Sequence, residues 1–65
     1  MVRLKTIWGS IDDKTNVNII YNGDLIETGD IEKIHISRDM LDKEIYTLIQ
    51  CETKDYKFID IEILE

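Results

Sequence analysis

Sixty-five residues suffice for one small domain, and a chain this short buries only about 60% of the surface that its unfolded form exposes. The formal net charge of −6, from 14 acidic and 8 basic residues, argues against direct nucleic-acid binding through a basic surface and against attachment to an anionic membrane. The single cysteine excludes an intrachain disulfide. We therefore expect residues 1–65 to form a single domain stabilised by aliphatic packing or by self-association.

Isoleucine dominates the composition, whereas alanine and proline are absent. The β-branched isoleucine favours strands, and alanine is the strongest helix former. The bias toward Ile, Lys, Asn and Asp is also typical of AT-rich codons, which suggests a low-GC bacterium, a phage or a mobile element. No apolar segment approaches the ~18 residues of a membrane span, and none follows the basic start as in a signal peptide, so we expect a cytoplasmic protein.

Residues 2–8 alternate apolar side chains with Arg3 and Lys5, which predicts a first strand. The polar residues 9–16 predict a loop. Residues 17–28 then predict a hairpin, because Asn22-Gly23 between two β-rich segments favours a type I′ turn. In that hairpin Ile19 is expected to face Ile26. One face of the hairpin would then carry five side chains, those of Val17, Ile19, Tyr21, Ile26 and Thr28.

Residues 31–37 predict a fourth strand, since Ile34 and Ile36 alternate with polar neighbours. Residues 37–52 allow two interpretations. One is an amphipathic helix over about 39–50. The other is a helical turn at 37–41, followed by a strand at 44–52 and a connection of three residues at 53–55. We favour the turn and strand, because 45–51 is a poor helix by propensity.

The strongest pattern lies in residues 56–64, where Ile59, Ile61 and Ile63 alternate with Asp60 and Glu62. A period of two places the three isoleucines on one face of a strand. In the preferred hairpin they would oppose the aliphatic face of the preceding strand, with Ile61 opposite Thr47. The predicted fold is mainly β: a small antiparallel roll or open barrel of five to six strands with one short helical turn. The alternative is an α+β fold with the helix 39–50 packed on a sheet.

Few residues carry reactive groups. His35 and Cys51 are the only histidine and cysteine, and no pattern in the sequence pairs them as a dyad. The polar residues between Asp12 and Asn18 lack the spacing of an EF-hand, and the isolated glycines form no phosphate-binding loop. Asp60 and Glu62 form the ordinary solvated side of a strand. We therefore predict no catalytic, metal or cofactor site.

Aromatic and apolar residues in excess of a small core suggest an interaction surface. In the preferred hairpin a second apolar face comprises Tyr46, Leu48, Phe58 and Leu64, while Trp8 is either a core residue or an interface anchor. The principal functional hypothesis is a non-enzymatic protein-interaction module. Its acidity permits a basic protein partner, whose identity the sequence does not give, and a homodimer is the other candidate assembly. The alternatives are an acidic inhibitor that imitates nucleic acid and a small enzyme using Cys51 and His35.

Overall fold

The computed structural model describes residues 2–65 and contains two α-helices, four strands and one 3-10 turn. In chain order the elements are α1 (Leu4–Trp8), β1 (Asn16–Tyr21), β2 (Asp24–Asp30), η1 (Ile31–Lys33), α2 (Arg38–Leu41), β3 (Thr47–Glu52) and β4 (Lys57–Ile63). The prediction of a mainly β fold with a helical turn is therefore confirmed in outline.

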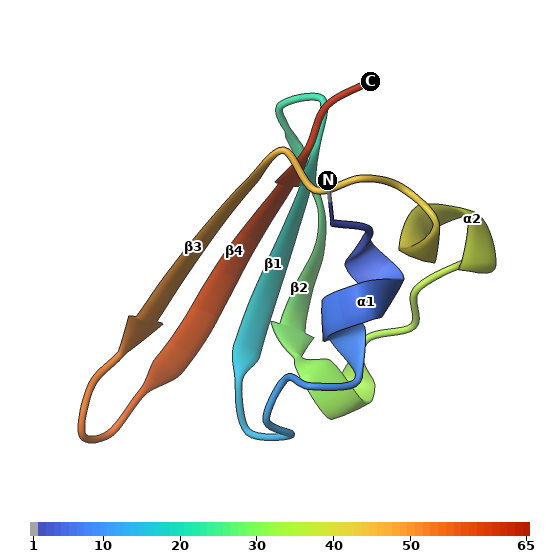
Figure 1. Cartoon of the computed structure of the whole chain (residues 1–65). Coiled ribbons are helices and arrows are strands. Elements are labelled where there is room, and N and C mark those ends of the chain that lie inside the picture. Colours follow the sequence, from blue (N-terminus) through green and yellow to red (C-terminus); the bar gives the residue numbers. More distant parts are fainter. Residues whose placement is uncertain (1) are drawn as a thin grey trace.

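The strands form one open, mixed sheet in the order β2-β1-β4-β3. β1 pairs with β2 and β3 pairs with β4 in antiparallel fashion, whereas the central strands β1 and β4 are parallel. Parallel neighbours need a crossover, and here the chain passes through η1 and α2 before it returns to the sheet. Figure 1 shows the helices gathered on one side of this sheet. The described chain thus has four strands and not five or six, and they form neither a roll nor a barrel.

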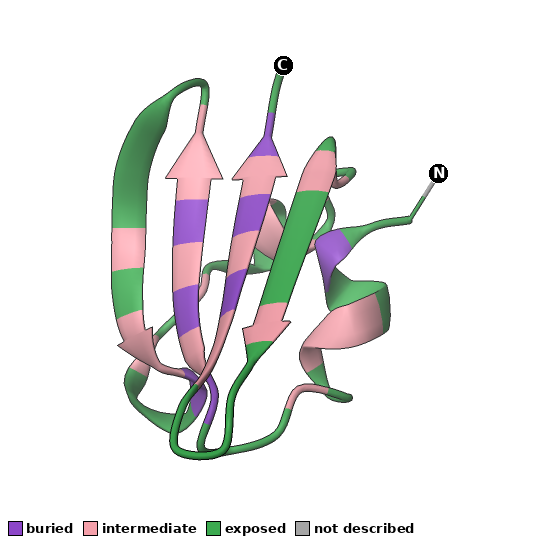
Figure 2. Ribbon diagram, turned by 90° about the vertical axis from the view of Figure 1, so that its left-hand side faces the viewer, coloured by how far each residue is buried: buried purple, intermediate pink, exposed green. Residues whose placement is uncertain are grey.

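The core lies between the central strands and the helical side. Its aliphatic side chains come from every second residue of β1 and β4, and Figure 2 shows the alternating buried bands along these two strands. The buried set is Leu4, Val17, Ile19, Ile31, Ile59, Ile61 and Ile63. The predicted strand over 56–64 with its isoleucine face is confirmed as β4.

The predicted hairpin at 17–28 is also confirmed. Asn22 and Gly23 adopt positive φ angles of 49° and 89°, as a type I′ turn requires. Its register is correct only near the turn, because Ile19 pairs with Glu27 and not with Ile26. The register shift inserts Ile26 as an extra residue on β2, so Thr28 lies on the face opposite Val17 and Ile19. Such bulges are common on edge strands, and β2 is an edge of this sheet.

The prediction of a strand at 2–8 was wrong, because Leu4–Trp8 is helical. Leu4, Ile7 and Trp8 follow the helical spacing i, i+3, i+4, so one face of α1 meets the core while Lys5 and Thr6 remain exposed. Backbone bonds fix the start of the helix, since Leu4 N–H donates to Lys43 O (2.9 Å). A segment of seven residues can fit both the two-residue period of a strand and the 3.6-residue period of a helix, so tertiary packing decided in favour of the helix.

The predicted strand at 31–37 was also wrong. The chain leaves β2 at Asp30, forms the 3-10 turn η1, and continues without pairing to a strand. Ile31 is buried, and Ile34 and Ile36 pack against the core from the helical side. The alternation of Ile34 and Ile36 with polar residues therefore reflects packing against the sheet, and this segment is not itself a strand of the sheet.

The preferred interpretation of residues 37–52 is confirmed, and the alternative helix over 39–50 is wrong. Ser37 caps α2 by accepting a hydrogen bond from Met40 N–H (3.1 Å), and the short helix ends before β3. However, β3 starts at Thr47, and Thr47 pairs with Glu62 and not with Ile61. Four residues, 53–56, connect the strands, and this one-residue difference reverses both faces of β3. Leu48 consequently lies on the core side, and Ile49 lies on the outer face.

Candidate interaction surface

β3 ends the sheet and has a free edge among the described residues. Thr53 N–H donates to Tyr56 O (2.7 Å), so these two residues form a hydrogen-bonded pair. In an antiparallel pair of strands, hydrogen-bonded and non-hydrogen-bonded pairs alternate, so every second residue of β3 counted from Thr53 bonds to β4. Thr47, Ile49 and Cys51 therefore direct their backbone groups toward β4. Leu48, Gln50 and Glu52 direct theirs away from the sheet, where they are open to an added strand.

A groove runs between this edge and α1, apolar in its first part and of mixed polarity in its second. One hollow of about 320 Å³ is lined by Val2, Ile7, Ile45, Tyr46 and Leu48. A second hollow of about 300 Å³ shares Ile7 and Leu48 with the first and continues past Gln50 toward Lys57. We call the two hollows together the β3 groove. Leu48 pairs with the buried Ile61 but is itself 40% exposed, so the aliphatic layer of the core reaches the surface here.

The outer face of the sheet has no covering element within residues 2–65, as Figure 2 shows. A chain of polar side chains crosses its centre: Thr28 Oγ1 donates to Asn18 Oδ1 (2.6 Å), and Asn18 Nδ2 donates to Asp60 Oδ1 (2.7 Å). Glu62 lies on the same face as Asp60, two residues along β4. This face therefore presents carboxylates between the apolar side chains of neighbouring strands.

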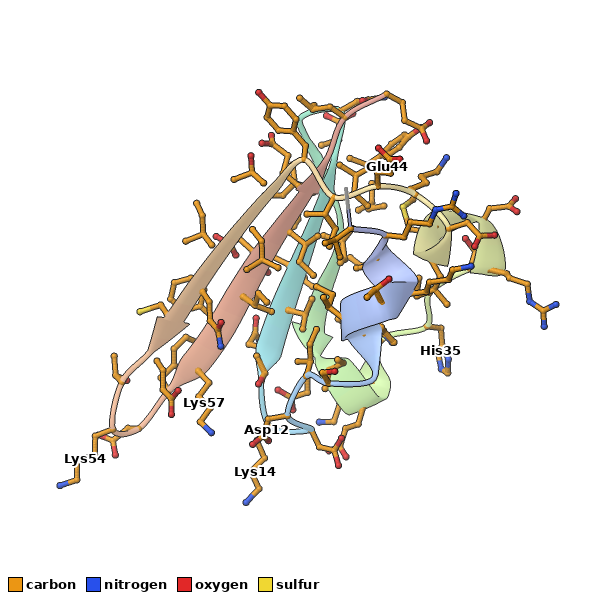
Figure 3. All side chains as sticks on the ribbon, viewed as in Figure 1. Asp12, Lys14, His35, Glu44, Lys54 and Lys57 are labelled. Atoms are coloured by element: carbon orange, nitrogen blue, oxygen red, sulfur yellow. The ribbon has the colours of Figure 1, made fainter. Side chains whose placement is uncertain are left out.

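The lower end of the β3 groove carries an ion-pair cluster. Lys57 Nζ lies 3.4 Å from Asp12 Oδ2 and 3.7 Å from Glu52 Oε1, and Figure 3 shows Lys57 and Asp12. The hydrogen bond from Lys14 N–H, followed by that from Lys57, lowers the pKa of Asp12, while the Asp12 hydrogen bond raises the pKa of Lys57. One lysine offsets one of the two carboxylates, so the cluster keeps a net charge of about −1 at this end of the edge strand.

A second cluster joins β1 to the chain beyond β4. Tyr21 Oη donates to Glu65 Oε2 (2.6 Å), Lys43 Nζ donates to Glu65 Oε1, and Asn22 Oδ1 accepts from Glu65 N–H (2.9 Å). The hydrogen bond from Lys43, followed by that from Tyr21, lowers the pKa of Glu65. Glu65 and Asn22 are exposed, and Tyr21 and Lys43 are only half-buried, so the stabilisation is small and sensitive to salt.

Replacing Glu65 with glutamine is expected to lower stability slightly at pH 7. The folded pKa of Glu65 lies below the unfolded value of 4.5, so its contribution is present above that value and is lost as the pH falls through the folded pKa. Thermal melts of both proteins from pH 7 to pH 2.5 would test this. The difference in Tm should vanish at the acid end, and a difference that grows on acidification contradicts the expectation.

The two reactive residues are not brought together. His35 precedes α2 on the helical side and lines a shallow hollow with Ile36 and Met40, whereas Cys51 lies on β3. Asp12 binds Lys14 N–H (2.9 Å) in the loop, while Asn18 lies on the outer face of the sheet, so the polar residues 12–18 do not converge on one point. No group of three potential metal ligands occurs within residues 2–65.

The five residues predicted as an interaction surface occupy separate places. Tyr46 and Leu48 line the first hollow of the β3 groove, whereas Phe58 borders the second hollow at the other end of β3, and its ring is 5.7 Å from that of Tyr56. Leu64 is exposed beyond the end of β4, and Trp8 is half-buried against the core. The single second face was wrong because it assumed the register that the four-residue connection shifts.

Val2, Ile7 and Gln50 also line the β3 groove, and none of them was predicted to belong to an interaction surface. The helical spacing of Leu4, Ile7 and Trp8 was an available signal for α1. No local pattern in the sequence indicates which strand lies at the edge of the sheet. The backbone groups of Gln50 are free to bind a partner only because β3 lies at that edge. Comparisons with protein-family models, curated proteins and solved structures found no match. Among residues 2–65 no helix is long and apolar enough to cross a membrane.

Proposed function

We propose that this chain is a non-enzymatic protein-interaction module that adds an extended segment of a partner to the β3 edge. The observation that carries the proposal is the free edge of β3 beside the apolar part of the β3 groove. Main-chain bonds to Leu48, Gln50 and Glu52 would supply affinity, and every second side chain of the added strand would enter the groove. No catalytic step is part of this proposal.

The side chains expected in the partner segment can be inferred from the surroundings of the two faces of an added strand. Its side chains toward the helices meet the apolar lining formed by Ile7, Tyr46 and Leu48, so they should be aliphatic. Its side chains toward the outer face lie beyond Ile49, on the face that carries Asp60 and Glu62, so lysine or arginine suits them. The net charge of −6 would also speed the approach of a basic segment.

Titration with a synthetic eight-residue peptide of alternating valine and lysine would test the proposal. The amide resonances of Leu48, Gln50 and Glu52 should shift most, because their N–H groups gain acceptors. The Gln50→Pro variant removes the central outward donor without removing a bond to β4, and it should weaken binding about tenfold or more, a loss of about 1.4 kcal/mol. Gln50→Ala retains the backbone donor and should bind like the original.

Two controls separate strand addition from attraction between charges. A peptide methylated on every backbone nitrogen keeps its charge but has no N–H donor on either edge, so it should fail to bind. The hypothesis of an acidic inhibitor predicts instead that binding collapses with added salt and is indifferent to Gln50→Pro. Equal binding of the methylated and unmethylated peptides would contradict strand addition.

A further inference from the structure

We propose that a second copy of the chain occupies the β3 edge, with the two β3 strands antiparallel about a two-fold axis at Ile49. The inference rests on the proposed function, because a second copy would use the same edge when no basic partner segment occupies it, and would compete with such a segment. A two-fold contact places one surface against itself, so the surface must complement itself in hydrogen bonding, in charge and in shape. The β3 edge meets these three conditions.

Hydrogen bonding restricts the possible registers. Outward backbone groups belong to Leu48, Gln50 and Glu52, and directly bonded residues in an antiparallel pair must both be outward. A two-fold axis at Ile49 pairs Leu48 of each copy with Gln50 of the other, which gives four backbone bonds. The overlap within β3 is then residues 47–51, because Tyr46 precedes the strand and its N–H already donates to Glu62 O (2.9 Å). An axis at Gln50 would pair Gln50 with itself and Leu48 with Glu52, which gives six bonds over residues 48–52. Hydrogen bonding therefore allows both registers, and the side chains must distinguish them.

Side-chain chemistry selects the axis at Ile49. Ile49 is 56% exposed on the outer face, and this axis places it against Ile49 of the second copy at a non-hydrogen-bonded pair, where side chains approach most closely. On the groove side Leu48 meets the uncharged Gln50. With the axis at Gln50, Leu48 would instead face the carboxylate of Glu52 beside the apolar hollow. Burying that charge would oppose association.

Charge also favours the edge over the outer face. A face-to-face dimer would bring Asp60 and Glu62 of two acidic chains together. Glu52 is the one charged residue of β3, and Lys57 lies 3.7 Å from its carboxylate. Two copies can therefore meet along β3 without apposed like charges, although each carries a net charge of −6. One strand pair is a small contact, so we expect a reversible dimer of the kind formed by interfaces below about 1,200 Å².

Cysteine cross-linking tests the register. In a Cys51→Ser background, Ile49→Cys should form a disulfide-linked dimer under mild oxidation, because the paired Cα atoms would lie about 4.5 Å apart, within disulfide range. The matched control is Leu25→Cys in the same background, since Leu25 is equally exposed but lies on β2 at the opposite edge. It should remain monomeric. Equal cross-linking of both variants, or cross-linking of Leu25→Cys alone, would overturn the proposal.

Sedimentation equilibrium tests the association without a cross-link. The mass should rise from one chain toward two between about 1 µM and 1 mM, the range of weak dimers. Gln50→Pro and Ile49→Lys should each keep the mass at one chain, the first by removing a donor and the second by apposing two cations. A monomer at every concentration overturns the second-copy proposal. The proposed function fails separately, if the valine–lysine peptide leaves the β3 amides unshifted.

Discussion

Replacing Ile61 with alanine is expected to destabilise the protein by about 2–5 kcal/mol. Ile61 is fully buried at the centre of β4, between β1 and β3, so truncation leaves a cavity that rigid neighbours fill poorly. A 65-residue domain has a free energy of unfolding of about 3–10 kcal/mol. The variant should therefore lose much or all of its folded population, as urea denaturation followed by circular dichroism would show.

Ile49→Ala is the matched control for this prediction. It removes the same atoms from the neighbouring strand, but Ile49 is 56% exposed on the outer face. Its cost should stay near 0.5 kcal/mol, as for ordinary surface substitutions. The measurement belongs at about 1 µM, where the proposed dimer is dissociated. Equal costs for the two variants would show that the sheet is covered on both faces, contrary to the fold described above.

Replacing Gly29 with alanine is expected to destabilise the protein by about 1–3 kcal/mol. Gly29 has φ +138°, a conformation that residues with a side chain rarely adopt. The added Cβ would lie 3.9 Å from Ile34 Cγ1, an ordinary contact, so the cost arises from the backbone and not from a clash. Thermal and urea unfolding would both report it.

Replacing Gly9 with alanine is expected to stabilise the protein, in contrast to the same replacement at Gly29. Gly9 follows α1 with φ −73° and ψ −11°, and a Cβ there has open space around it. Alanine restricts the unfolded chain at no conformational cost to the folded one, so stability should rise by about 0.4–1 kcal/mol. Destabilisation by Gly9→Ala, or indifference to Gly29→Ala, would contradict the backbone conformations at these two glycines.

The proposed binding edge depends on a one-residue difference in the β3–β4 connection. With three connecting residues, Ile49 would oppose the buried Ile59 and Leu48 would face outward. With four, Leu48 opposes Ile61 and lines the β3 groove, while Ile49 lies on the outer face. The aliphatic residues of β3 thus stay near the surface on both sides of the strand. This arrangement supports the proposed binding at the β3 edge and not at the β2 edge, because β2 carries Asp24, Glu27 and Asp30.

Local patterns in the sequence determined the elements with strong short-range signals. The alternating isoleucines defined β4, Asn22-Gly23 defined the β1–β2 turn, and the poor helix propensity of 45–51 favoured a strand. Each of these signals acts between residues that are close in the chain, through side-chain period or permitted φ angles. The absence of clustered reactive residues from the sequence likewise favoured the prediction of an interaction surface over that of a catalytic site.

Tertiary structure alone decided the remaining features. Residues 2–8 and 31–37 fit a strand pattern, but a segment becomes a strand only if its backbone pairs with a neighbouring strand. These two segments do not pair with the sheet, and they pack their aliphatic side chains against the core from the helical side. The parallel pairing of β1 with β4 and the edge position of β3 depend on contacts between residues far apart in the chain. Such contacts are set by the closure of the whole core, so no local pattern reveals which strand keeps a free edge.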